Sequence, residues 1–138
     1  MKSTIVWGGA RSFTGTTEDG FSVRIGTAHE NTAKPGPSAM ELVLMGAGTC
    51  SAYDVVSILE KGRQDVVDVT VSLEADRAET PPKVFTRIHM HFTVAGRNVN
   101  EDRVARAIEL SVEKYCSATA MLEKTADVTH SFSVTEAT

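Results

Sequence analysis

The chain has 138 residues, of which 41% are hydrophobic and 23% charged, and its formal net charge is −4. This size and composition predict a single globular domain over residues 1–138 and exclude an intrinsically disordered chain. Lysine and arginine are scattered along the chain instead of forming a basic stripe, which argues against a nucleic-acid partner.

The first predicted elements form a β-hairpin. Residues 3–7 and 21–25 are short β-rich runs, and Asp19-Gly20 between them is a turn signal. A loop rich in glycine, proline, asparagine and lysine is expected over residues 27–37.

A capping box gives the strongest local signal in the sequence. Ser38 and Glu41 have the required spacing directly after Pro37, and they predict a helix from Ala39 to about Lys61, with Gly62 as its stop. The first half of this helix is apolar almost all round and contains two glycines. Such a helix is expected to be buried in a core or in an interface with another subunit.

The second half of the chain predicts strands, helices and a final strand. Residues 66–74 and 84–94 alternate between apolar and polar, which indicates an antiparallel pair with one buried face. In the first of these strands the apolar face carries Val67, Val69, Val71 and Leu73. Asn100 is expected to cap a second helix, from Glu101 to about Tyr115, followed by a short helix to Lys124. A last strand is expected over residues 128–134. The order predicts an α+β fold without the regular βαβ units of a nucleotide-binding protein.

The N-terminus runs straight into a strand pattern, without the apolar region of a signal peptide, and no stretch is expected to provide the roughly 20 apolar residues of a membrane span. We therefore expect a cytoplasmic protein without a membrane partner. In the cytosol two cysteines are not expected to form a permanent disulfide, and they are too few for a zinc site made of cysteine alone.

Cys50 and Cys116 are the candidate reactive residues, and the sequence leaves two interpretations open. They are either small buried hydrophobes or a functional thiol pair. Burial alone would raise the pKa of Cys50, so a reactive Cys50 needs a cation or a hydrogen-bond donor nearby. The two cysteines can meet only through tertiary packing.

Four histidines and one tyrosine are further candidates for ligands or pocket residues. His89 and His91 share one face of a predicted strand, a spacing compatible with a metal, but an exposed polar face is the favoured interpretation. His130 falls among inward positions of the last strand and is expected in the core, and His29 lies in a loop. Tyr53, three residues after Cys50, either lines the same pocket or simply packs. No cofactor and no metal site is predicted.

Three segments of the chain resemble the OsmC/Ohr family of osmotically inducible and organic hydroperoxide resistance proteins. Residues 37–42 and 45–50 resemble the segment of the peroxidatic cysteine, and residues 113–117 resemble the segment of the second cysteine. The order of elements matches over essentially the whole chain. Residues 40–42 and 113–117 look closest to the YhfA-like branch.

The resemblance implies an OsmC-like fold in an intertwined homodimer, with long helices packed between sheets. It implies that Cys50 attacks an organic hydroperoxide as a thiolate and becomes a sulfenic acid. Cys116 then condenses with Cys50 to a disulfide, which an external thiol reductant reduces.

The resemblance also implies an arginine beside the first cysteine and a glutamate that holds it. Here Met40 occupies the usual glutamate position and Glu41 follows it, while Arg11 stands where the arginine would be and Arg24 is a second candidate. Glu41 also has a structural role in the capping box. Three functions therefore stay open: a thiol peroxidase, a module that binds a small hydrophobic ligand or lipid, and a weakly active or inert stress-related dimer.

Overall fold

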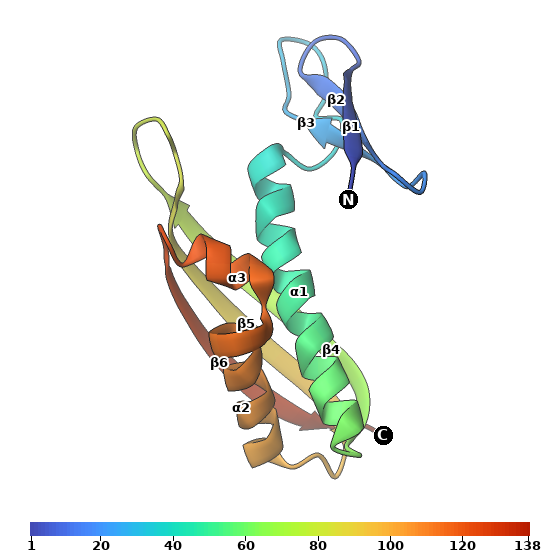
Figure 1. Ribbon diagram of the computed structural model, residues 1–138, viewed down its shortest axis with the longest axis vertical. Helices are drawn as coiled ribbons and strands as arrows, with labels where there is room; N and C mark the ends of the chain where they lie inside the picture. The colour runs from blue at the N-terminus through green and yellow to red at the C-terminus, as the bar shows by residue number, and fades with distance from the viewer. The chain divides into compact units, whose positions relative to one another are not determined.

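The computed structural model describes all 138 residues and divides them into two compact units, residues 1–45 and residues 46–138. Each unit carries one three-stranded sheet, and a long helix, α1, runs from the first unit into the second (Figure 1). The predicted α+β class is confirmed. That the whole chain forms one domain stays a prediction.

The first unit contains a strand that the sequence analysis missed. β1 (Ser3–Trp7), β2 (Ser12–Thr17) and β3 (Ser22–Gly26) form an antiparallel sheet in chain order. The Asp19-Gly20 turn therefore joins β2 to β3, and not β1 to β3 as predicted. β2 lacks an alternating apolar pattern because Gly15 occupies its centre, where a Cβ atom would lie 3.1 Å from Ile5 Cδ1 and 3.2 Å from Ile25 Cδ1.

α1 (Ala39–Lys61) begins and ends with local hydrogen bonds. The predicted capping box is present, because Ser38 N donates to Glu41 Oε1 over 2.9 Å and Glu41 N donates to Ser38 Oγ over 3.2 Å. The helix stops where predicted, but the left-handed residue is Arg63, with φ +59°, and not Gly62. Hydrogen bonds from Arg63 N to Glu60 O and from Gln64 N to Leu59 O complete a Schellman motif.

By length and composition alone, α1 is apolar enough to cross a membrane, so the expectation that no such stretch exists was wrong. The same helix gives Ser51, Val55 and Leu59 to the protein interior. It also carries Asp54 and Glu60, and its second half packs in the core of the second unit.

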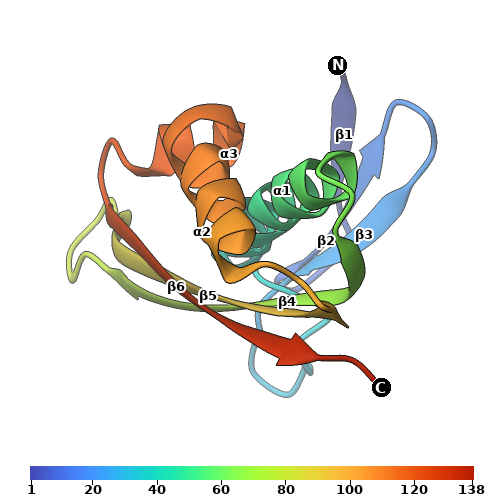
Figure 2. The ribbon, with the colours of Figure 1, turned by 90° about the horizontal axis from the view of Figure 1, so that it is seen from below.

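The second unit is a sheet of three long strands with helices on one face. β4 (Asp65–Arg77) and β5 (Phe85–Arg97) form the predicted antiparallel pair, and β6 (Asp127–Glu136) lies parallel to β5 on its other side. The chain crosses from β5 to β6 through α2 (Glu101–Leu110), the π-helical turn η1 (Ser111–Tyr115) and α3 (Ser117–Leu122). Figure 2 shows α2 and the second half of α1 above the same sheet face.

This crossover changes two predictions. The fold lacks a series of βαβ units, as expected, but β5, the helical segment and β6 form one such unit. The second helix is also not continuous to Tyr115, since its α-helical part ends at Leu110 and one π-helical turn follows. The predicted cap is present: Asn100 Oδ1 accepts from Arg103 N over 3.1 Å.

The core of the second unit lies between the sheet and these helices. It is made of apolar residues from three elements, and all are at most 1% exposed: Val55, Leu59, Ile88, Met90, Phe92, Val94, Val104, Ala107 and Ile108. β5 follows the predicted alternation, with its apolar side chains facing the helices. The central strand of the sheet is thus its most buried element.

Two side-chain predictions were wrong. Val67 was expected on the buried face of β4 but is 51% exposed, because a bulge between Val66 and Asp68 interrupts the alternation. His130 was expected in the core but is exposed, because β6 is an edge strand that the helices cover only in part. His89 and His91 lie on the polar face and bond the hydroxyls of Thr129, Ser131 and Ser133 on β6.

Candidate thiol site

Cys50 and Cys116 come together in the second unit, although they lie on different elements. Cys50 is in the middle of α1, and Cys116 is the residue between η1 and α3. Their sulfurs and a carboxylate oxygen of Asp54 all lie within 4.8 Å of one another. Both thiols are free. Tertiary packing therefore brings the two cysteines together, and it also places the Asp54 carboxylate beside their sulfurs.

The π-helical turn determines the position of Cys116. The turn closes with a hydrogen bond of 2.7 Å from Cys116 N to Ser111 O, after which the backbone of Cys116 becomes extended, with φ −74° and ψ 104°. Cys116 thereby becomes the N-cap of α3, and its sulfur accepts a hydrogen bond from Thr119 N over 3.4 Å. N-cap side chains accept such bonds because the first N–H groups of a helix have no partner within it.

Two buried serine hydroxyls donate hydrogen bonds to Cys116 and Asp54 in the site. Ser51 Oγ donates to Cys116 Sγ over 3.3 Å, and Ser111 Oγ donates to Asp54 Oδ2 over 2.9 Å. Both serines are 0% exposed. Sequence reasoning missed both serines and the part that Asp54 plays. A usable signal existed, since Ser51 and Asp54 are polar residues at i+1 and i+4 from Cys50 in an apolar helix.

The two thiols differ in acidity. Burial alone would raise the pKa of Cys116, but hydrogen bonds from Ser51, Thr119 and Cys50 outweigh burial and lower it. Burial raises the pKa of Cys50, and the hydrogen bond and charge of Cys116 raise it further, against the lowering effect of the Ala118 and Ser117 N–H groups. The hydrogen bonds around the pair thus favour the thiolate form of Cys116 more than that of Cys50.

Access to solvent follows the opposite order. Cys116 is only 2% exposed, whereas Cys50 is half-buried. A reagent that enters from solvent meets Cys50 first, whereas the hydrogen-bond donors that favour a thiolate surround the buried Cys116. The more accessible thiol is thus Cys50, and the thiol with the lowered pKa is Cys116.

Arg11, Arg24 and Glu41 belong to the first unit, and their action on the thiol pair stays a prediction. The Arg11 side chain is exposed and donates to Ala10 O, while Arg24 donates to Ser12 Oγ over 3.5 Å. Glu41 accepts from Lys34 Nζ and from Ser38 N. The hydrogen bond from Lys34, followed by those from Ser38, lowers the pKa of Glu41 from 4.5 to about 2.

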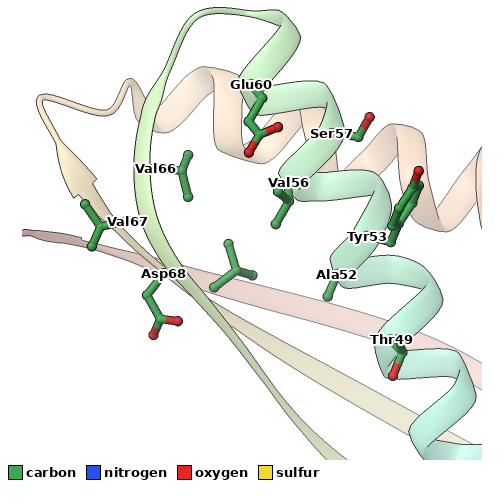
Figure 3. A pocket seen from close by; sticks show the side chains of 10 residues that line it. Thr49, Ala52, Tyr53, Val56, Ser57, Glu60, Val66, Val67 and Asp68 are labelled. Atoms are coloured by element: carbon green, nitrogen blue, oxygen red, sulfur yellow. The ribbon is translucent and has the colours of Figure 1, made fainter.

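A groove between α1 and β4 is separate from the thiols. It has a volume of about 550 Å³ and is lined by Thr49, Ala52, Tyr53, Val56, Ser57, Glu60 and residues 66–69. Figure 3 shows Val56 and Val66 pointing into the space between the two elements. Neither cysteine lines it. Tyr53, 74% exposed, therefore borders this groove, and Asp54 is the neighbour that reaches the sulfurs.

Comparison with known proteins identifies the family of this chain. A family model described as OsmC-like protein matches residues 29–131. The chain belongs to this OsmC-like family. The protein YhfA of Escherichia coli strain K12 is 47% identical to it over 137 residues, which are 99% of this chain and 100% of YhfA. The predicted family resemblance, including its YhfA-like branch, is confirmed.

Solved structures of OsmC-like proteins and their relatives share this fold. A hypothetical protein from Aquifex aeolicus VF5 is 30% identical, with a TM-score of 0.86 over 99% of this chain and 97% of that one. The organic hydroperoxide resistance protein OhrB of Bacillus subtilis has a TM-score of 0.63 over 96% of this chain and 98% of that one. At 14% identity, the likeness to OhrB shows the fold alone.

Proposed function

We propose that this OsmC-like protein reduces organic hydroperoxides in the cytosol, using Cys50 and Cys116 as a redox pair and an external thiol as reductant. The observation that carries the proposal is the approach of the two free sulfurs to within 4.8 Å. A disulfide, with a sulfur–sulfur bond of about 2.05 Å, requires the two sulfurs to move closer together. Family membership and the description of OhrB as a hydroperoxide resistance protein support the choice of substrate.

The accessibility and acidity of the pair fit a cycle in which Cys50 attacks and Cys116 holds the charge. The buried Cys116 thiolate takes the proton of Cys50 as the Cys50 sulfur attacks the terminal peroxide oxygen. The O–O bond breaks, the alkoxide takes a proton from solvent and leaves as an alcohol, and Cys50 becomes a sulfenic acid. Cys116 then attacks the Cys50 sulfur, water leaves, and a disulfide forms. Two external thiols reduce this disulfide and become a disulfide themselves.

Arg11 and Glu41 are proposed as further members of the site, by analogy with the arginine and glutamate that the family resemblance implies. Replacing Arg11 with alanine is then expected to slow oxidation of the protein by hydroperoxide, while the reduction of its disulfide by thiols keeps its rate. Lys2→Ala, in which an exposed cation of the same unit is lost, is the control. Equal effects of both substitutions would remove Arg11 from the site.

The decisive experiment adds one equivalent of cumene hydroperoxide to the reduced protein and follows its mass. The expected product is a Cys50–Cys116 disulfide, and Cys116→Ser is expected to accumulate the Cys50 sulfenic acid instead. Turnover with excess thiol should stop in Cys50→Ser. Wild-type consumption no faster than that of Cys50→Ser, or the absence of the crosslink, would overturn the proposal.

A second candidate function is the binding of a small hydrophobic ligand, and the groove between α1 and β4 favours it. The groove is partly lined by valines, including the exposed Val67, and contains neither cysteine. Binding there would survive replacement of both cysteines by serine and would be lost in Val56→Asp. A fluorescent fatty-acid probe measures this, and absence of saturable binding to the wild type excludes it.

We also propose that the protein is a homodimer. Three large apolar side chains of α1 are exposed, namely Val43, Met45 and Tyr53, at 43%, 47% and 74% of their surface. The proposed contact face is the part of α1 that carries them. A second copy that covers this face would remove the apolar surface from water. Sedimentation equilibrium at micromolar concentration tests the stoichiometry, and a monomer would contradict it.

A further inference from the structure

Asp54 has no role in the thiol chemistry proposed for the site. Asp54 lies one helical turn after Cys50 on α1, and its carboxylate comes within 4.8 Å of both sulfurs. A carboxylate next to a thiolate is unfavourable for either charge unless a proton or a cation lies between them. The site therefore gathers three donor atoms that a single cation would satisfy together.

We propose that Cys50, Asp54 and Cys116 bind a divalent zinc ion, with its fourth position open to water or to an external ligand. Zinc takes thiolate and carboxylate ligands in tetrahedral geometry, whereas calcium and magnesium require oxygen ligands and are poor partners for sulfur. Zn–S bonds of about 2.3 Å and Zn–O bonds of about 2.1 Å place neighbouring ligand atoms roughly 3.5 to 3.8 Å apart. The cluster meets this with a local contraction.

The hydrogen bonds around the three ligands fit a metal site. Ser111 Oγ donates to Asp54 Oδ2, which orients the carboxylate, and Ser51 Oγ and Thr119 N donate to Cys116 Sγ. Outer hydrogen bonds of this kind fix the geometry of metal ligands and reduce the charge that thiolates place on the ion. The half-buried Cys50 and Asp54 leave an approach for the ion from solvent.

Metal binding and disulfide formation exclude each other at this site. A zinc ion replaces the thiol protons and occupies both sulfurs, so neither sulfur can bond to the other until the ion leaves. The sequence predicted no metal site because two cysteines are too few, and Asp54 is the third ligand that it did not assign. The inference does not depend on the proposed peroxidase activity, because it requires no oxidant.

The test uses the full-length, reduced, chelator-treated protein without peroxide. Titration of zinc against a chromophoric chelator is expected to show one ion per chain. Cobalt(II) in its place should give the visible absorption of a tetrahedral ion and a thiolate charge-transfer band. Asp54→Asn, which keeps the shape but removes the charge, is expected to weaken binding at least about 10-fold, and Ser111→Ala about 10-fold or more.

Asp68→Asn is the matched control, since Asp68 is an exposed aspartate on β4 outside the site. Circular dichroism of each variant verifies that it is folded. Zinc should also protect the wild-type thiols from oxidation by diamide, and this protection should be lost in Asp54→Asn. Wild-type binding no tighter than that of Cys50→Ser/Cys116→Ser, an octahedral cobalt spectrum, or unchanged affinity in Asp54→Asn would overturn the proposal. Hydroperoxide reduction without zinc binding would overturn the zinc site alone. Zinc binding without hydroperoxide reduction would overturn the proposed function alone.

Discussion

Replacing Ser51 with alanine tests the electrostatics of the thiol site. The Ser51 hydroxyl donates to Cys116 Sγ over 3.3 Å, and both residues are at most 2% exposed, so water cannot readily replace the lost donor. The substitution should therefore destabilise the thiolate and raise the pKa of Cys116. The side chain that replaces it is smaller by one oxygen, so the fold should be kept.

The size of the effect follows from the strength of this bond. A hydrogen bond to a charged group contributes about 1.5–3 kcal/mol, and sulfur is a weaker acceptor than oxygen. Thr119 N continues to donate to the sulfur in the variant. A loss of about 1–2 kcal/mol is therefore expected, which corresponds to a roughly 5- to 30-fold smaller acid dissociation constant of the Cys116 thiol.

Ultraviolet absorbance of the thiolate, followed against pH, measures this without a reagent that must reach the buried sulfur. The titration is made in a Cys50→Ser background, which leaves a single thiol and keeps a hydroxyl donor at position 50. The double variant Cys50→Ser/Cys116→Ser gives the tyrosine baseline. The midpoint for Cys116 should move to higher pH when Ser51→Ala is added.

Ser57→Ala is the matched control, because Ser57 lies on the same helix and lines the groove instead of the thiol site. It should leave the midpoint where it is. An unchanged midpoint in Ser51→Ala, with the fold intact by circular dichroism, would refute the assignment of Ser51 as a thiolate donor. An equal shift in Ser57→Ala would show a general effect on the helix.

Three further predictions concern stability. Arg63→Gly relieves a left-handed residue with φ +59° and should raise the free energy of unfolding by about 0.5–1 kcal/mol in urea titrations, whereas a loss would contradict the Schellman assignment. Asn100→Ala removes the N-cap of α2 and should cost about 1 kcal/mol, while Asn100→Asp should cost little. The pKa of Glu41 is lowered to about 2, chiefly by Lys34, so its stabilising effect is complete above about pH 4.5 and is lost as the pH falls through about 2. Glu41→Gln should therefore lower Tm at neutral pH, and the difference should shrink as the pH falls toward 2 and vanish only below it. A difference in Tm that stays constant down to pH 2 would contradict the linkage.

Local signals in the sequence determined most of the elements. The capping box at Ser38 and Glu41, the N-cap Asn100 and the alternation of β5 each depend on residues within one turn or one strand. Such signals are readable because the hydrogen bonds that they form join residues three or four positions apart. The family resemblance rested on similar short segments, and the comparisons confirmed it.

Features that depend on contacts with distant parts of the chain could not be predicted from local signals. β2 does not show the alternating apolar pattern of a strand, because Gly15 stands at its centre. A small residue is needed there, between Ile5 and Ile25 on the neighbouring strands. The parallel pairing of β6 with β5 depends on how the α2–α3 segment crosses the sheet. The exposure of His130 follows from the edge position of β6, which the alternation of its own residues does not reveal.

For the site, the sequence by itself determined that Cys50 lies in the middle of an apolar helix and that Cys116 follows a second helix. Only the tertiary structure decided that the two sulfurs and Asp54 lie within 4.8 Å of one another. It also decided which thiol is the stronger acid, because the donors to Cys116 come from Ser51 on α1 and from Thr119 at the start of α3. Acidity and burial are properties of the surroundings of an atom in space, and packing brings those surroundings together from segments about 65 positions apart.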